Sequence, residues 1–183
     1  MNKENSKPID ILMIGSSIMK KWTNPNFINY PSYINLGVSR FKTDDIIKSN
    51  YLDLIEKFNP KYIIYYCGGN DIEKKIQVNN IIINIVKFIK FVYNNFNPDV
   101  KIIFISIIIS PKKIKNQLES KINLLNKMIE KICLKINKSF RSNKLIYFEI
   151  NDLLNDSDYT KDLNHLLSKA YDKINFRINT ILF

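Results

Sequence analysis

Four side chains of this sequence have the types and spacing needed to hydrolyse an ester. Ser17 stands in a Gly-Ser-Ser-Ile stretch and Asn70 in a Gly-Gly-Asn-Asp stretch. His165 is the only histidine of the chain, and Asp162 precedes it by three residues. A hydroxyl, an imidazole and a carboxylate form a nucleophilic serine triad, and an amide N–H can stabilise the resulting oxyanion. These residues predict acyl transfer through a serine.

Ser17 lies between an apolar run and a candidate helix. Glycine permits a tight turn there, and a helix that begins at this point directs its backbone N–H groups toward an anion. The hydroxyl of Ser17 would be exposed beside those donors, and Ser16 would line the same site. A serine at this place can equally be an ordinary helix N-cap. A phosphate-binding loop is disfavoured because neither G-x-x-x-x-G-K-S/T nor G-x-G-x-x-G occurs.

Asn70 follows another apolar run, and Gly69 beside it is a candidate for lining the site. Two glycines followed by Asn-Asp can form a simple turn. An asparagine at this place can also direct an amide N–H toward the anion that the Ser17 turn would bind. Donors that converge from neighbouring strand ends form an oxyanion hole.

His165 and Asp162 fall in the region that follows the last apolar run. Asp162 can hold one ring nitrogen of His165 and leave the other free as a general base. The competing interpretation gives Asp162 a helix N-cap role and leaves His165 solvated. Glu149 and Asp152 are alternative carboxylate partners.

The elements that must position these residues are five short apolar runs, several of them continuous and rich in β-branched residues. This pattern is typical of parallel strands that are buried on both faces. The runs occupy residues 9–14, 33–36, 62–67, 101–107 and 144–150.

Four longer segments between or after these runs have helical periodicity. We expect helices over residues 47–58, 82–96, 114–136 and 167–181. Alternating strands and helices predict an α/β fold, a three-layer α/β/α sandwich around a parallel sheet. Active sites of such sheets lie beyond the carboxyl ends of the strands, where the four side chains above are expected.

These stretches, in this order, resemble the SGNH or GDSL-like hydrolase family over almost the whole chain. The family's first block carries the nucleophile, its third block carries Asn, and its last block reads Asp-x-x-His. The chain is also similar to a subgroup with Gly-Ser-Ser and a nearby tryptophan, here Trp22, and with the Phe-Ile-Ser and Ser-Pro sequences that begin at Phe104 and Ser110. The resemblance implies a flavodoxin-like domain with a five-stranded parallel sheet, spanning residues 1–183 as a single domain.

The resemblance also implies roles for individual residues. Ser17 is the expected nucleophile, Asp162 and His165 complete the triad, and the backbone N–H of Ser17 and the side chain of Asn70 belong to the oxyanion hole. Arg40 stands where the family has a second oxyanion glycine. Its N–H can serve only if the local backbone conformation accepts a residue other than glycine.

Two neighbours of Arg40 are alternatives for this donor. Ser39 or Gly37 takes the role if the loop is shifted. The side chain of Arg40 suggests a further hypothesis, in which it reaches over the site and favours an anionic substrate.

We therefore expect a serine esterase that forms an acyl-enzyme and uses no metal or organic cofactor. A short acyl group, such as acetyl on a sugar or a small ester, is the preferred substrate because the chain leaves little room for a lid or a deep acyl tunnel. The alternatives are a catalytically inactive protein of the same fold that binds a ligand, and a flavodoxin-like nucleotide or flavin binder. The sequence does not decide whether the chain forms a homodimer.

Composition and charge bear on other classes of function, such as nucleic-acid binding. The 183 residues include 28 Lys and Arg against 17 Asp and Glu, a formal charge of +11. The lysines are scattered and no nucleic-acid-binding motif occurs, so we expect no nucleic-acid partner. Cys67 and Cys133 lie in apolar segments and are expected as buried free thiols. Neither a signal peptide nor a membrane-spanning run is visible, so we expect a cytoplasmic protein whose residues 1–7 are disordered.

Overall fold

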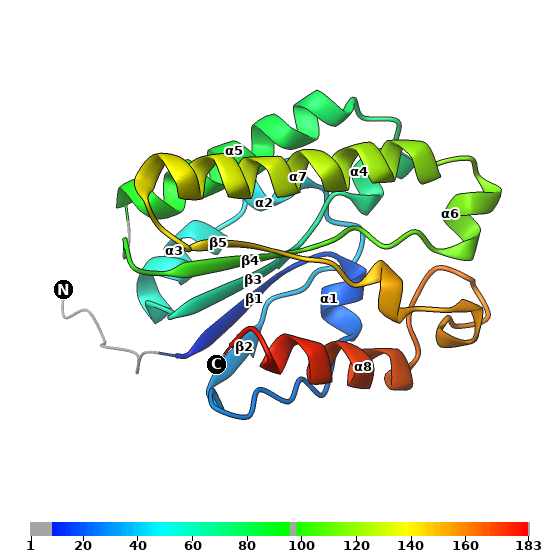
Figure 1. Cartoon of the computed structure of the whole chain (residues 1–183), viewed down its shortest axis with the longest axis horizontal. Helices are drawn as coiled ribbons and strands as arrows, with labels where there is room; N and C mark the ends of the chain where they lie inside the picture. Colours follow the sequence, from blue (N-terminus) through cyan, green and yellow to red (C-terminus); the bar gives the residue numbers. More distant parts are fainter. Residues whose placement is uncertain (1–8, 96–97, 183) are drawn as a thin grey trace.

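The strands form one parallel sheet of the order β2-β1-β3-β4-β5 in a computed structural model that describes residues 9–95 and 98–182 (Figure 1). Residues 1–7, for which the sequence predicts disorder, lie outside the described residues. The strands are β1 Ile11–Gly15, β2 Tyr33–Asn35, β3 Tyr62–Tyr66, β4 Lys101–Ile105 and β5 Leu145–Phe148. All four pairings are parallel, and the order is that of flavodoxin-like sheets.

Eight α-helices and two short 3₁₀ turns lie between or after these strands in the described part of the chain. The helices are α1 Ser17–Lys21, α2 Thr43–Lys48, α3 Tyr51–Phe58, α4 Gly69–Glu73, α5 Val78–Asn95, α6 Pro111–Lys115, α7 Glu119–Phe140 and α8 Ser168–Asn179. The 3₁₀ turns, Asn151–Leu153 and Asp156–Asp158, lie between β5 and α8.

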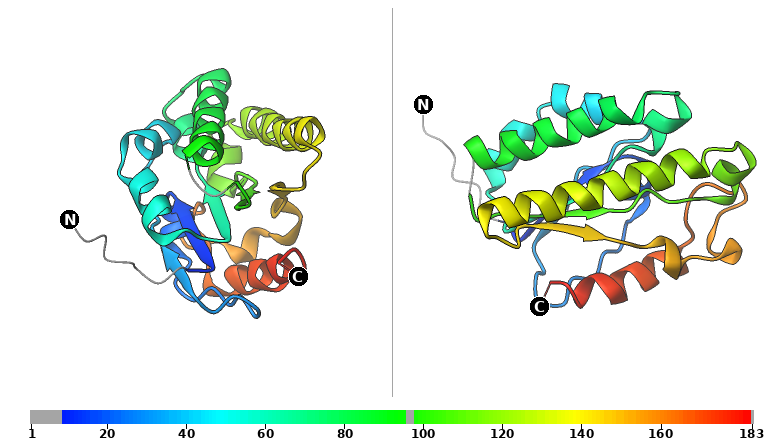
Figure 2. Two further views of the ribbon diagram at one scale, coloured as in Figure 1. Left: turned by 90° about the vertical axis from the view of Figure 1, so that its left-hand side faces the viewer. Right: turned by 45° about the horizontal axis from the view of Figure 1, so that its top comes forward.

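The helices cover both faces of the sheet, as expected for a three-layer sandwich. Figure 2 shows α5 and α7 on one face and α8 on the other, and Figure 1 places α1 on the same side as α8. All residues of β1 and β3 are buried, whereas the edge strands β2 and β5 are partly exposed. This burial explains why the central strands are continuous apolar runs rather than alternating ones.

Two of the predicted helices are wrong in their extent. The segment 47–58 is divided into α2 and α3, because Ser49 adopts an extended conformation and its hydroxyl bonds the carbonyl of Ile46. The segment 114–136 is also divided, because Gln117 has a left-handed φ of 57° between α6 and α7. The short helix α4 was not expected. The remaining two helices are confirmed within a few residues, except that Phe96 lies outside the described residues.

The topology brings the ends of β1 and β3 together at one edge of the sheet. Gly15 and Tyr66, the last residues of these strands, are direct partners in the parallel register. This is the point at which the strand order reverses, which is where ligands bind in open parallel sheets. Cys67 and Cys133 are buried free cysteines, as expected. In the described part of the chain no helix has the length and apolar character needed to cross a membrane.

Candidate active site

Ser17 is the first residue of α1, directly after the sharp turn at the end of β1. The turn requires glycine at position 15, because a Cβ atom there would lie 2.2 Å from the carbonyl oxygen of Tyr66. Ser16 is the N-cap of α1 and its N–H donates to the same Tyr66 oxygen at 3.0 Å. The N-cap interpretation of Ser17 is therefore wrong, and its hydroxyl is left free to make other contacts.

The hydroxyl of Ser17 contacts the imidazole of His165. The distance between Ser17 Oγ and His165 Nε2 is 3.0 Å, and the other ring nitrogen, Nδ1, lies 2.5 Å from Oδ2 of Asp162. The structure thus brings together the three side chains that the sequence singled out. Their order, hydroxyl to imidazole to carboxylate, is the arrangement that generates a serine nucleophile.

Asp162 is held in place by hydrogen bonds to its second oxygen. Oδ1 accepts from the hydroxyl of Thr160 at 2.6 Å and from the backbone N–H groups of Asn164 and His165 at 2.9 and 3.0 Å. Partial desolvation would raise the pKa of Asp162, but these bonds and the one from the His165 ring lower it below its usual value. The carboxylate therefore stays ionised and orients the ring.

The alternative roles considered for these carboxylates are wrong. Asp162 is not a helix N-cap, because α8 begins at Ser168 with Leu167 as its N-cap. Asp152 pairs with Arg177 at 2.6 Å. Glu149 accepts hydrogen bonds from the hydroxyls of Ser106 and Tyr147 at 2.7 and 2.8 Å.

The loop that carries Asp162 and His165 is fixed to the start of α6. The N–H of Lys112 donates to the carbonyl of Leu163 at 3.0 Å, and the Ser110 hydroxyl donates to Oδ1 of Asn164 at 3.0 Å. Leu163 itself has a left-handed φ of 56°. These contacts were not predicted, although Ser110 belongs to the Ser-Pro sequence that resembles the subgroup.

Asn70 lies on α4 with its amide near the loop that follows β2. Its Nδ2 donates to the carbonyl of Phe41 at 2.8 Å, which leaves the second N–H of the same amide for another acceptor. The neighbouring Asp71 is buried and accepts from the N–H and hydroxyl of Thr43, so α4 is fixed against α2. Burial raises the pKa of Asp71.

Arg40 adopts a left-handed backbone conformation, which residues other than glycine adopt only uncommonly. Its φ is 68°, in the left-handed region that favours glycine. Gly37 does not fit the role, because its N–H donates to Asn35 Oδ1 at 2.9 Å. The N–H groups of Ser39 and Arg40 donate to no acceptor among the described residues. The side chain of Arg40 is exposed.

A small cavity opens beside Ser17. Its volume is about 10 Å³, enough for about one water molecule, and its lining includes the predicted residues Ser16, Gly69 and Asn70. Lys113, a buried lysine that was not predicted as a site residue from the sequence, also lines the cavity. Desolvation lowers the pKa of Lys113 to about 8, and Glu73 opposes this shift.

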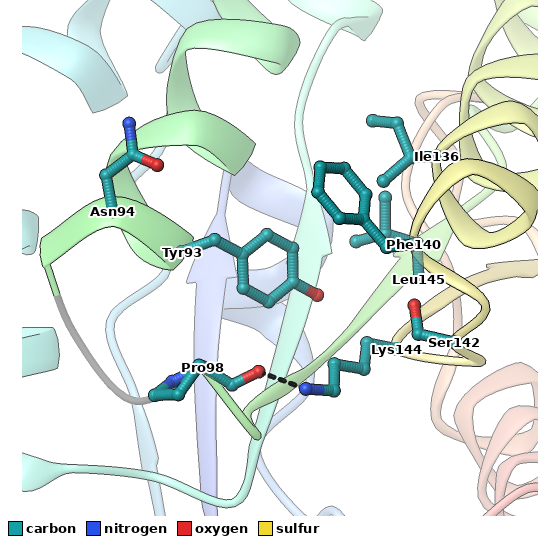
Figure 3. Close-up of a pocket in the computed structure, with 8 residues that line it drawn as sticks. All are labelled: Tyr93, Asn94, Pro98, Ile136, Phe140, Ser142, Lys144 and Leu145. Atoms are coloured by element: carbon teal, nitrogen blue, oxygen red, sulfur yellow. Dashed lines mark hydrogen bonds between the residues drawn. The ribbon is translucent and has the colours of Figure 1, made fainter.

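A larger cavity of about 340 Å³ lies elsewhere, near the start of β5 (Figure 3). Tyr93, Phe140 and Leu145 give it an apolar lining, and Lys144 bonds the carbonyl of Pro98 at its edge. This cavity lies near the amino ends of the strands, whereas Ser17 lies at their carboxyl ends. Within residues 9–95 and 98–182, no group of three or more His, Cys, Asp or Glu side chains is placed to hold a metal ion.

Solved structures share this fold. A GDSL-like lipase from Bacteroides thetaiotaomicron is 21% identical with a TM-score of 0.75, and the match covers all of this chain and 90% of that one. A family 3 carbohydrate esterase from Clostridium thermocellum is 16% identical with a TM-score of 0.72, over 97% and 99% of the two chains. An acetyl esterase, solved as a serine-to-alanine variant with an acetate ion, is 16% identical with a TM-score of 0.74, over 95% and 96%.

No protein-family model matches this sequence, and no curated protein matches it. The likeness in structure nevertheless extends over almost the entire chain. The chain therefore has the SGNH or GDSL-like hydrolase fold, as its sequence motifs predicted.

Proposed function

We propose that this chain is a serine esterase that cleaves a short-chain carboxylic ester through an acyl-enzyme. The observation that carries the proposal is the continuous contact from Ser17 Oγ through the His165 ring to the Asp162 carboxylate, at 3.0 and 2.5 Å. A ligand-binding protein without activity would not need this arrangement, so the esterase is the function that the geometry supports best.

In the proposed reaction, Ser17 Oγ attacks the ester carbonyl while His165 Nε2 removes its proton. The tetrahedral intermediate collapses, and His165 returns the proton to the leaving alcohol. His165 then removes a proton from a water molecule, which attacks the carbonyl of the acyl-enzyme. The acid leaves as His165 returns this proton to Ser17 Oγ. Asp162 holds the ring in the required tautomer and stabilises its charged form.

The oxyanion of this intermediate needs donors that lie ready before the reaction. We assign this role to the backbone N–H of Ser17, the free amide N–H of Asn70 and the backbone N–H of Arg40. Arg40 is preferred over Ser39 because its left-handed φ of 68° suits a position where glycine is usual. Gly37 is excluded, since its N–H is already bonded within its own loop.

The small cavity beside Ser17 supports a short acyl group. A cavity with room for about one water molecule is too small for a long alkyl chain. Among the proteins of similar structure, an acetyl esterase is consistent with acetyl as the acyl group, and a carbohydrate esterase is consistent with a sugar as the alcohol. An acetylated sugar or a small acetate ester is therefore the substrate class that we propose.

A panel of p-nitrophenyl esters of graded acyl length, assayed beside acetylated sugars, tests this function. Among unsubstituted acyl groups we expect the highest kcat/KM with acetyl and a steep fall with longer chains, and we expect no turnover in the Ser17→Ala variant. Hydrolysis that persists in Ser17→Ala, or a preference for long chains, would contradict the proposal.

A further inference from the structure

The buried side chain of Lys113 ends at the cavity beside Ser17. It is 5% exposed, and its Nζ donates to the carbonyl oxygen of Ile108 at 3.1 Å. The amine lies directly over Gly69, since a Cβ atom at that position would be only 3.0 Å from Nζ. The absence of a side chain at Gly69 therefore leaves space for the amine beside the nucleophile.

Most of the hydrogen-bonding capacity of this amine is unused. An ammonium group has three N–H donors, and Ile108 accepts one of them. No carboxylate among the described residues forms an ion pair with Lys113, although Glu73 lines the same cavity. Buried donors without acceptors cost free energy. An acceptor that enters the cavity would remove this cost.

The backbone that carries this lysine is fixed relative to the loop of the proposed base. Ser110 Oγ caps α6 by accepting from the N–H of Lys113, and it also bonds Asn164, the neighbour of His165. The backbone of Lys113 and the loop that carries His165 thus share one anchor. The field from Glu73 favours the ammonium form, whereas desolvation has lowered the pKa of Lys113 to about 8.

We infer that Lys113 is a specificity-determining residue that selects acyl groups with an oxygen on the carbon next to the ester carbonyl, such as glycolyl and other 2-hydroxyacyl groups. This inference rests on the proposed function. When the carbonyl carbon is bonded to Ser17 Oγ, the second acyl carbon lies at the mouth of the cavity, which has room for about one water-sized group. A hydroxyl on that carbon accepts a hydrogen bond from Nζ, whereas a methyl group leaves the buried donors unpaired.

Methyl glycolate and methyl propionate form a matched pair for the test, because they differ only by a hydroxyl in place of a methyl group. We expect wild type to prefer the glycolate by roughly 10- to 100-fold in kcat/KM, the usual effect of a hydrogen bond from a charged donor. The Lys113→Met variant should lose this preference. Lys115→Met, a change of an exposed lysine on the same helix, should keep it.

Binding of the free acids separates failure of this inference from failure of the proposed function. Glycolate should bind wild type about tenfold more tightly than propionate, and the difference should vanish in Lys113→Met. This preference without any ester hydrolysis would overturn the esterase and leave the role of Lys113 standing. Equal affinity for the two acids, including no measurable binding of either, overturns the inference. The comparison in wild type decides the question even if Lys113→Met fails to fold.

Discussion

The ring nitrogen Nε2 of His165 lies 3.0 Å from the hydroxyl oxygen of Ser17, although 148 positions separate the two residues in the chain. The contact depends on the parallel sheet, which places Ser17 after β1, and on the long loop after β5, which returns His165 to the same edge. The proposed reaction therefore depends on contacts between distant segments, and single substitutions can break these contacts one at a time.

Replacing Asp162 with asparagine should lower kcat by roughly 10³- to 10⁴-fold. An amide at this position no longer selects the tautomer in which Nε2 can accept the proton of Ser17. The matched control is Asp152→Asn, because Asp152 was a rival partner in the sequence but pairs with Arg177 in the structure. Steady-state kinetics on an acetyl ester measures both. If Asp152→Asn proved the more damaging change, the assignment of the carboxylate would be wrong.

Replacing Asn70 with alanine should reduce kcat by about 10²- to 10³-fold with little change in KM, because an oxyanion donor acts mainly in the transition state. Asn80→Ala, on an exposed position of α5, serves as the control. The Asn70→Ala variant also loses the hydrogen bond to the Phe41 carbonyl, so its unfolding curve should be recorded. A loss of activity that merely follows a loss of folded protein would argue against the oxyanion role.

Replacing Arg40 with glycine should leave turnover intact, because the proposed donor is a backbone N–H. Glycine removes the strain of a left-handed φ in the folded state, which stabilises the protein. Glycine also has more conformational freedom in the unfolded chain, which destabilises it, so the free energy of unfolding should change by no more than about 1 kcal/mol. Arg40→Ala, compared with wild type on neutral and anionic esters, tests whether the side chain favours anionic substrates. Comparable rate ratios in the two proteins would reject that hypothesis.

Lys113 should make the free energy of unfolding depend on pH in the alkaline range. Its pKa is lowered from 10.5 to about 8 in the folded state by desolvation, with Glu73 opposing and Lys112 reinforcing the shift. Between these values the unfolded chain binds more protons, so the stability contributed by this group rises with pH.

Urea unfolding from about pH 7 to about pH 10 checks this prediction. The difference in unfolding free energy between wild type and Lys113→Met should shift in favour of wild type by on the order of 3 kcal/mol across the window. The difference, rather than the absolute value, isolates Lys113 from the tyrosines that titrate in the same range. A difference that does not vary with pH would mean that the amine is not desolvated in solution.

Much of the fold could be predicted because strands buried on both faces leave a strong mark on the sequence. The predicted runs at residues 9–14 and 62–67 contain most of β1 and β3, which are buried throughout because helices cover both faces of the sheet. The helix boundaries at Ser49 and Gln117 could not be predicted in the same way. They depend on a side-chain hydrogen bond and a left-handed φ that do not interrupt the apolar periodicity.

The candidate site was predictable to the extent that its residues follow strand ends in recognisable order. Ser17, Asn70, Asp162 and His165 were selected by that reasoning. Arg40, which aligns with a glycine of the family, has a left-handed φ that the sequence did not predict. Lys113 was missed because a lysine in a Lys-rich chain is expected at the surface. Only the folded structure, in which its amine lies over Gly69 and bonds the carbonyl of Ile108, reveals that this lysine is buried.

Covalent labelling with a serine-reactive phosphonate, read by intact-mass and peptide mass spectrometry, tests the central claim most directly. We predict stoichiometric modification of wild type at Ser17, with strong loss of labelling in His165→Ala and none in Ser17→Ala, while circular dichroism shows that both variants remain folded. An unmodified wild-type protein, or a label carried by another residue, would contradict the account.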